Sequence, residues 1–180
     1  MPIAGSACGA VLTAAHMKSL CDIIAEQSFF RGLSADHLRQ LADNAMQTRF
    51  AADELIFREG DFANRFYLIV AGKVALEAPD CLGKVTCFQT VGASELLGWS
   101  WMFSPAIWHL HARALEPTEA IFFYGTRLRE LCETDHDLGY EVFRRVSEVM
   151  MQRLHTTRRR LLETHGPDPD ASSDWRPGQH

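Results

Sequence analysis

The first apolar residues of the chain recur at helical spacing. Leucine and isoleucine residues spaced three and four apart predict a short amphipathic helix within residues 18–27. Ser34 is placed to cap a second helix over residues 35–45, and Asp36 adds a negative charge to the first turn of that helix. The patterned part of the chain is therefore predicted to begin with two helices, within residues 18–27 and over residues 35–45.

Between residues 48 and 124 the pattern changes to short runs of β-branched and aromatic residues separated by turn residues. Strands at such short intervals are typical of an antiparallel barrel or a double-sheet jelly roll. The predicted strands cover residues 48–50, 55–57, 66–70, 74–78, 85–91, a short piece near 96–101, 109–115 and 120–124.

Residues 57–74 contain the most specific part of this pattern. Gly60 and Asp61 supply the chemistry of a turn, because glycine accepts positive φ and aspartate can bond to its own backbone. The apolar run 66–70 fits a strand that is covered on both faces. Gly72 then turns the chain so tightly that we expect the strands on either side of it to pair antiparallel.

Helical periodicity returns after Gly125. We predict a short helix over residues 126–133 and one long helix from residue 135 or 136 to about residue 163. The apolar stripe of the long helix is longer than one small sheet could cover, so we expect part of it to pair with the same helix of a second subunit. The alternative is a helix that lies wholly on its own domain. The predicted dimer interface consists of Val142, Val146, Val149, Met150 and Arg153.

Length, charge and cysteine usage restrict the class of protein. The chain of 180 residues is long enough for one well-buried domain. Its formal net charge of −5 is unlike that of a general nucleic-acid binder, which is usually basic. The five cysteines have no C-x-x-C spacing, which indicates reduced thiols and a cytoplasmic protein. Nothing runs apolar for the about 18 residues that a membrane helix needs, so we expect no membrane partner.

The two ends of the chain differ from its centre. No lysine or arginine occurs before residue 18, so residues 1–17 do not resemble a secretory signal. We expect them to form a flexible segment, with Met17 as an alternative start of translation. Residues 165–180 are polar and rich in proline, which is typical of a disordered tail. The predicted domain therefore covers residues 18–164.

The stretch FREGDFANRFYLIVAGKV, residues 57–74, resembles the glycine-turn signature of the cyclic-nucleotide-binding domain family. The pattern Phe-x-Gly-Leu-Ser-x-x-x-Leu-x-x-Leu, which begins at Phe30, resembles the helical lead-in of the same family. The resemblance covers roughly residues 20–163. It implies an α+β, mainly β fold, namely an antiparallel jelly-roll barrel of the cyclic-nucleotide-binding type with N-terminal helices and a long C-terminal helix.

The resemblance also implies a regulatory or accessory module rather than an enzyme. Bacterial transcription factors built on this domain carry a helix-turn-helix after the long helix, and no residues remain here to form one. We therefore expect no direct recognition of DNA and an output that passes through a partner protein. Stand-alone domains with a tryptophan-rich cassette look like accessory subunits of bacterial redox complexes, including the small subunit of NAD-linked hydrogenases. That likeness implies a dinucleotide or a protein as the ligand.

The phosphate-binding cassette of the family reads Gly-Glu-[Leu/Ile]-[Ala/Gly]-[Leu/Phe], followed by Arg-[Ser/Thr]-Ala. Its glutamate accepts bonds from the ribose hydroxyl, and its arginine neutralises the cyclic phosphate. Laid on this pattern, Gly98 keeps the glycine and Trp99 takes the glutamate position. Trp108 takes the arginine position, and His109 takes the Ser/Thr position. Losing the arginine costs a phosphate ligand about 1.5–3 kcal/mol, so we expect no tight binding of ordinary cyclic AMP.

Two alternatives keep an anion site in this part of the chain. Glu95 could be the cassette glutamate if the preceding loop is shorter, and Arg113 could reach a different anion. The dense aromatic residues between 99 and 108 could stack on a base or a nicotinamide ring, or they could plug the pocket. The cofactor is thus left open between a cyclic nucleotide, a nicotinamide dinucleotide and none. The candidate pocket residues are Glu95, Leu97, Gly98, Trp99, Ser100, Trp108, His109, His111 and Arg113.

His109 and His111 alternate along a predicted strand, so both imidazoles could meet one metal ion. Together with Glu116 they resemble the first half of the cupin metal motif. The flanking glycines and a downstream strand histidine are missing, so we predict no metal site. The alternative is two partly exposed strand histidines. The sequence contains no arrangement of serine, cysteine or paired carboxylates that would support catalysis, and no catalytic residue is predicted.

Overall fold

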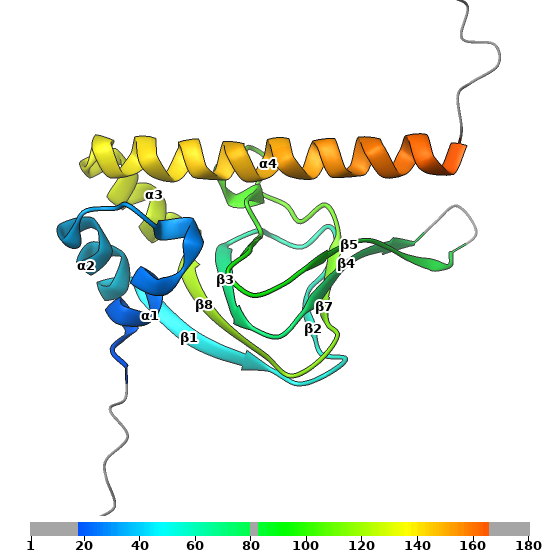
Figure 1. The fold of residues 1–180 in the computed structure, drawn as a ribbon, viewed down its shortest axis with the longest axis horizontal. Coiled ribbons are helices and arrows are strands. Elements are labelled where there is room, and N and C mark those ends of the chain that lie inside the picture. Colours follow the sequence, from blue (N-terminus) through cyan, green and yellow to red (C-terminus); the bar gives the residue numbers. More distant parts are fainter. Residues whose placement is uncertain (1–17, 80–82, 166–180) are drawn as a thin grey trace, which may run out of the picture.

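The architecture is a pair of antiparallel four-stranded sheets with helices at one end and one long helix across them (Figure 1). The computed structural model describes residues 18–79 and 83–165, so the predicted segment 1–17 and nearly all of the predicted tail lie outside the described residues. The two sheets and the long C-terminal helix confirm the predicted fold class. The first sheet has the order β1 (Ala45–Phe50), β8 (Thr118–Tyr124), β3 (Arg65–Ala71), β6 (Leu96–Leu97), and the second has the order β2 (Leu55–Phe57), β7 (His111–Ala114), β4 (Val74–Pro79), β5 (Val85–Val91).

Strand β3 of the first sheet is buried on both faces. Phe66 and Leu68 of β3 pack in the apolar cluster that includes the helices, whereas Tyr67 and Ile69 pack in the cluster formed with the second sheet. All four side chains are at most 2% exposed. Burial on both sides explains why this strand is a continuous apolar run, and it confirms the prediction made for residues 66–70.

The turn at Gly72 carries the chain from the first sheet to the second. β3 pairs with β8 and β6, whereas β4 pairs with β5 and β7. The predicted antiparallel pairing across this turn is therefore wrong. Gly72 has a φ of 95°, and a Cβ atom there would lie 2.5 Å from Oγ1 of Thr118. The backbone thus passes directly against the start of β8 as it leaves the first sheet.

The segment between β6 and β7 is irregular where strand was predicted. It forms the short 3-10 helix η2 (Ser100–Met102). Further along, the backbone N–H of Trp108 donates to the carbonyl oxygen of Asp61 at 2.9 Å, so this part of the chain pairs with the turn at residues 60–61. As a consequence β7 begins at His111, and His109 lies outside it.

The N-terminal helices are α1 (Leu20–Glu26), η1 (Ser28–Phe30) and α2 (Ala35–Asp43). The hydroxyl of Ser34 accepts a hydrogen bond from the backbone N–H of His37 at 3.1 Å, which confirms Ser34 as the cap of α2. The helix ends two residues earlier than predicted, because Ala45 already belongs to β1.

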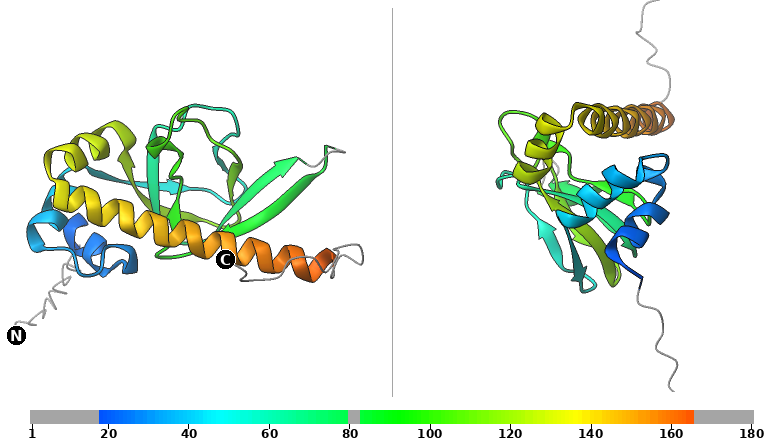
Figure 2. Two further views of the ribbon diagram at one scale, coloured as in Figure 1. Left: turned by 90° about the horizontal axis from the view of Figure 1, so that it is seen from above. Right: turned by 90° about the vertical axis from the view of Figure 1, so that its left-hand side faces the viewer.

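Two helices complete the chain, α3 (Gly125–Thr134) and α4 (His136–His165). Asp135 accepts a hydrogen bond from the backbone N–H of Leu138 at 3.0 Å, and this bond lowers the pKa of the Asp135 carboxyl. α4 runs the full length of the molecule and extends along the β4–β5 hairpin (Figures 1 and 2). Within the described ranges no helix is both long and apolar enough to cross a membrane.

The apolar stripe of α4 packs on the chain's own domain. Val142 and Val146 are 2% and 1% exposed and belong to the same cluster as Phe66. Val149 and Met150 pack against this cluster, and Arg153 is buried as well. The structure therefore places most of the predicted dimer interface inside one subunit. The N-terminal helices supply the cover that the sheet alone could not, because Phe29 and Phe30 of η1 join this cluster.

A second row of residues on α4 lies beside the buried stripe and is more exposed, and Met150 belongs to both. Its members are spaced alternately three and four apart, the spacing of a two-stranded coiled coil. Tyr140, Phe143, Leu154 and Leu161 of this row are between 55% and 67% exposed. We call this row the α4 seam; it consists of Tyr140, Phe143, Ser147, Met150, Leu154, Thr157 and Leu161.

Candidate functional site

Trp108 fills the position next to the glycine that follows β6. Gly98 has a φ of 82°, and a Cβ atom at Gly98 would lie 2.6 Å from the Trp108 ring. The indole stacks on Phe57 with ring centroids 3.9 Å apart and an interplanar angle of 11°. Trp108 is only 4% exposed. We call the arrangement of Gly98, Trp108 and Phe57 the cassette corner, and its surface is apolar.

The other two tryptophans of this segment lie on the helical side. The guanidinium carbon of Arg153 lies 4.6 Å from the centroid of the Trp99 ring, at cation–π distance. Trp101 is 5% exposed and packs edge-on against Phe66 at 6.1 Å. All three indoles are thus engaged by neighbouring side chains of the same domain.

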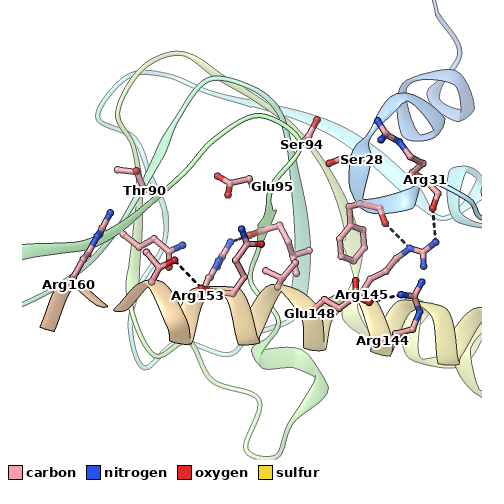
Figure 3. A pocket seen from close by; sticks show the side chains of 16 residues that line it. Ser28, Arg31, Thr90, Ser94, Glu95, Arg144, Arg145, Glu148, Arg153 and Arg160 are labelled. Atoms are coloured by element: carbon pink, nitrogen blue, oxygen red, sulfur yellow. Dashed lines mark hydrogen bonds and ion pairs between the residues drawn. The ribbon is translucent and has the colours of Figure 1, made fainter. Parts of the chain in front are cut away.

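A cavity of about 560 Å³ lies between α4, η1 and the segment from β5 to β6 (Figure 3). We call it the α4 groove. Its volume is in the range of cavities that hold small-molecule ligands. Polar side chains dominate its wall. It is lined by Ser28, Phe29, Arg31, Gln89, Thr90, Ser94, Glu95, Leu96, Arg144, Arg145, Glu148, Val149, Gln152, Arg153, Thr156 and Arg160.

Arg153 is the most unusual cation of the groove. It is 9% exposed, and its guanidinium donates to the backbone carbonyl of Leu96. Burial lowers the pKa of Arg153 to about 10, although the negative charge of Glu95 opposes this effect. Within residues 18–79 and 83–165, no carboxylate lies within ion-pair distance of it. Arg153 is therefore a buried positive charge that has no direct counter-ion among the described residues.

The neighbouring arginines of the groove have partners. Arg145 donates to the carbonyl oxygens of Phe29 and Arg31, both at 2.8 Å, and forms an ion pair with Glu141. These bonds tie α4 to η1. Arg160 donates to the carbonyl oxygen of Phe88 at 2.9 Å and so ties the end of α4 to β5. The walls of the groove are thus held by hydrogen bonds at both ends.

Of the predicted pocket residues, Glu95 lines the groove, and it comes from a different element than Arg153 (Figure 3). Its carboxylate accepts a hydrogen bond from the backbone N–H of Gly92 at 2.6 Å. Leu97 is fully buried in the cluster between the sheets, and Ser100 is 8% exposed within η2. The side chains predicted to form one pocket are therefore divided among several environments.

Arg113 and His111 do not line the groove. Arg113 forms an ion pair with Glu77 at 3.2 Å and donates to the carbonyl oxygen of Asp53 at 2.9 Å, so both of these contacts lie within the domain. Nδ1 of His111 accepts from the backbone N–H of Glu59 at 3.1 Å.

The two histidines do not share a strand face. His109 is exposed in the loop before β7 and outside that strand. The part of the chain that the structure describes contains no group of three or more His, Cys, Asp or Glu side chains able to hold a metal ion.

The polar half of the groove was not predicted from the sequence. Gln152 and Thr156 follow the buried stripe of α4 at helical spacing, whereas Arg145 lies within the apolar part of the helix, next to Val146. The signal that could have identified Gln152 and Thr156 is the change of this stripe from apolar to polar residues after Val149. Such a change indicates that the helix extends beyond the hydrophobic core and there lies over a more polar, solvent-exposed surface.

Residues 47–135 match the family model of the cyclic nucleotide-binding domain. The CRP-like cAMP-activated global transcriptional regulator of Mycobacterium tuberculosis is 24% identical over 144 residues, which cover 79% of this chain and 62% of the regulator. The chain thus matches about three-fifths of the length of this curated relative.

Solved structures give the same picture of the fold. A cyclic nucleotide-binding domain from Methylobacillus flagellatus has a TM-score of 0.72 at 20% identity, with 84% of this chain and 85% of that chain covered. A proposed cyclic nucleotide-binding protein from Geobacter metallireducens has a TM-score of 0.64 at 27% identity, with coverages of 72% and 93%. At such identities the structural likeness indicates a shared fold and does not identify the ligand.

Proposed function

Because the chain belongs to the cyclic nucleotide-binding domain family, we propose that it is a non-enzymatic regulatory module whose phosphate-binding corner is closed to ordinary cyclic AMP. The observation that carries this proposal is the position of Trp108. Its ring contacts the space beside Gly98 and stacks on Phe57, where a cyclic phosphate would need a cation. Replacing a charge-assisted contact by an apolar ring removes about 1.5–3 kcal/mol of phosphate binding.

The module acts through another protein chain in this proposal. A first partner is a second copy, bound through the α4 seam, whose exposed residues have the spacing of a coiled coil. This moves the dimer contact from the buried stripe to the neighbouring, more exposed face of α4, and only Met150 belongs to both. A second partner is the protein that receives the signal, and a redox complex remains the candidate suggested by the resemblance described above.

A thermal unfolding experiment tests the closed corner. Ligand that binds the folded state at about 1,000 times its dissociation constant stabilises a protein by about 4 kcal/mol. We expect cyclic AMP and cyclic GMP at millimolar concentration to leave the unfolding temperature unchanged, because Gly98, Trp108 and Phe57 of the cassette corner offer no cation to the cyclic phosphate. A clear upward shift with either nucleotide, saturating with concentration, would contradict the proposal.

The second candidate function is a sensor that binds an anionic ligand, such as a nicotinamide dinucleotide or a cyclic nucleotide, in the α4 groove. The observation that favours it is Arg153, a buried charge that has no direct counter-ion among the described residues and lies at the wall of a cavity of about 560 Å³. A buried charge that has no ion-pair partner is costly, and a bound phosphate would relieve part of that cost. Trp99 lies directly under the Arg153 guanidinium, so ligand binding would also alter the environment of that indole.

A further inference from the structure

The α4 groove follows one face of α4 toward the C-terminal end of that helix. Figure 3 shows Arg160 at this end of the groove and Arg145 at the other end. Residues spaced three and four apart on a helix share a face. The lining residues on the last turns of α4 have this spacing; they are Gln152, Arg153, Thr156 and Arg160.

The charges at the end of the groove near η1 are largely paired. Arg144 forms ion pairs with Glu148 at 2.5 Å and with Glu141 at 2.9 Å, and Arg145 also pairs with Glu141. Arg31 lines this end as well and is exposed. Two arginines therefore meet two glutamates here, and this end of the groove has little attraction left for a further anion.

The other end of the groove carries a surplus of positive charge. Arg153 and Arg160 line it, and Glu95 is the carboxylate nearest to them among the described lining residues. Arg153 is buried, whereas Arg160 is exposed and donates to the carbonyl oxygen of Phe88 at 2.9 Å. An arginine has five N–H donors, so Arg160 can bind a carboxylate while it keeps such a bond. An occupant of this end should therefore be acidic.

The segment joined to this end of α4 has that charge. α4 ends at His165, and residues 166–180, which lie outside the described residues, read GPDPDASSDWRPGQH. They contain Asp168, Asp170 and Asp174 against one arginine, Arg176. A segment whose composition is typical of disorder can still be ordered by contacts with a folded surface. The sequence thus supplies an acidic segment next to the basic end of the groove.

The segment is long enough to return along the groove. An α-helix rises 1.5 Å per residue, so Arg160 lies about 7.5 Å and Arg153 about 18 Å back from His165 along the axis. An extended chain covers about 3.3 Å per residue, so Asp170 reaches about 16 Å and Asp174 about 30 Å from His165. Both distances exceed what is needed and leave length for the chain to turn.

We propose that residues 168–174 bind in the α4 groove of the same chain, antiparallel to α4. The carboxylate of Asp170 accepts charge-assisted hydrogen bonds from the exposed Arg160, and Asp174 brings a negative charge close to the buried Arg153. Because the segment is linked to the groove, its effective concentration is in the millimolar range, and even weak contacts keep it bound for much of the time.

The inference deepens the second candidate function and rests on it only in treating the groove as a site for negatively charged groups. An anionic ligand would have to displace the segment before it could occupy the same end of the groove. The segment thus selects for ligands that bind the groove more tightly than its own aspartates do.

The test measures backbone order parameters of the full chain, labelled with nitrogen-15, by nuclear magnetic resonance in a buffer of low ionic strength. We expect values above about 0.6 at residues 168–174, because a bound segment moves with the domain. A variant with both Asp170→Asn and Asp174→Asn is expected to give values below about 0.6 there, while the domain itself stays unchanged.

Two arginine variants test whether the groove is the binding surface. Arg160→Gln is expected to lower the order parameters of the segment as the aspartate variant does. Arg159→Gln is the matched control, since Arg159 is exposed on the same helix and does not line the groove. We expect this variant to leave the segment ordered.

Low order parameters in the unchanged chain would overturn the proposal, and so would equal effects of the two arginine variants. High values that persist in the aspartate variant would do the same. High values that fall on dilution would assign the segment to the groove of a second copy and would overturn binding within one chain. The sample contains no nucleotide, so failure of this inference is distinguishable from failure of the closed corner or of ligand binding in the groove.

Discussion

Replacement of Gly98 by alanine is expected to lower the free energy of unfolding by about 2–4 kcal/mol, because a strained φ and an overpacked contact add at one position. The φ of Gly98 is 82°, and the new Cβ would meet the Trp108 ring at 2.6 Å. That ring cannot move away freely, since it stacks on Phe57 at 3.9 Å. Urea denaturation followed by tryptophan fluorescence measures the change.

Gly60→Ala is the matched control for this prediction. Gly60 has a φ of 85°, yet nothing lies within 4 Å of the position of its Cβ atom. Its replacement is expected to cost only the backbone strain, about 1–2 kcal/mol. Equal losses for the two variants would mean that Trp108 does not occupy the space beside Gly98, and the account of the cassette corner would be wrong.

Replacement of Leu154 by glutamate is expected to dissociate the proposed dimer into monomers, with the dissociation constant raised on the order of 100-fold. Leu154 is 62% exposed in the single chain and lies in the middle of the α4 seam. In a symmetric pair of helices its own counterpart faces it, so the substitution brings two carboxylates together at an apolar contact. Sedimentation velocity over a range of concentrations measures the effect.

His155→Glu is the control for the seam, because His155 is exposed one position away from it. We expect this variant to sediment as the unchanged protein does. A wild-type chain that remains monomeric at every concentration, or a Leu154→Glu chain that still dimerises, would contradict the proposed contact. A dimer that dissociates instead in the His155 variant would place the contact on another face of α4.

Much of the fold could be predicted because its signals are local. Runs of β-branched and aromatic residues located β5 at Val85–Val91 without error, and the side chain of Ser34 caps α2 as expected. The sheet assignment could not be predicted in this way. Whether the turn at Gly72 joins two strands of one sheet or passes to another depends on the contact with Thr118, which is distant in the sequence.

The surroundings of α4 could not be predicted from local signals either. The periodicity identified the buried stripe of Val142 and Val146, but it could not tell which surface covers that stripe. Phe29 and Phe30 of η1 provide this cover within the chain. The α4 seam is harder to recognise, because Ser147 and Thr157 interrupt its apolar residues.

The candidate site was identified only in part. Glu95 and Arg153 were both named from the sequence, one as a cassette residue and the other as a dimer contact. The fold places them at one groove, because α4 crosses the segment before β6 (Figure 3). No spacing in the sequence relates two residues that lie on separate elements.

The cassette corner is proposed to be closed to ordinary cyclic nucleotides. Isothermal titration of the purified protein with cyclic AMP tests it most directly, with cyclic GMP, NADH and NADPH titrated in parallel and tryptophan fluorescence recorded alongside. We expect no saturable heat with either cyclic nucleotide. Binding of NADH or NADPH that disappears in the Arg153→Gln variant would support the second candidate function. Binding of cyclic AMP at micromolar concentration would contradict the account and identify the protein as a cyclic-nucleotide sensor.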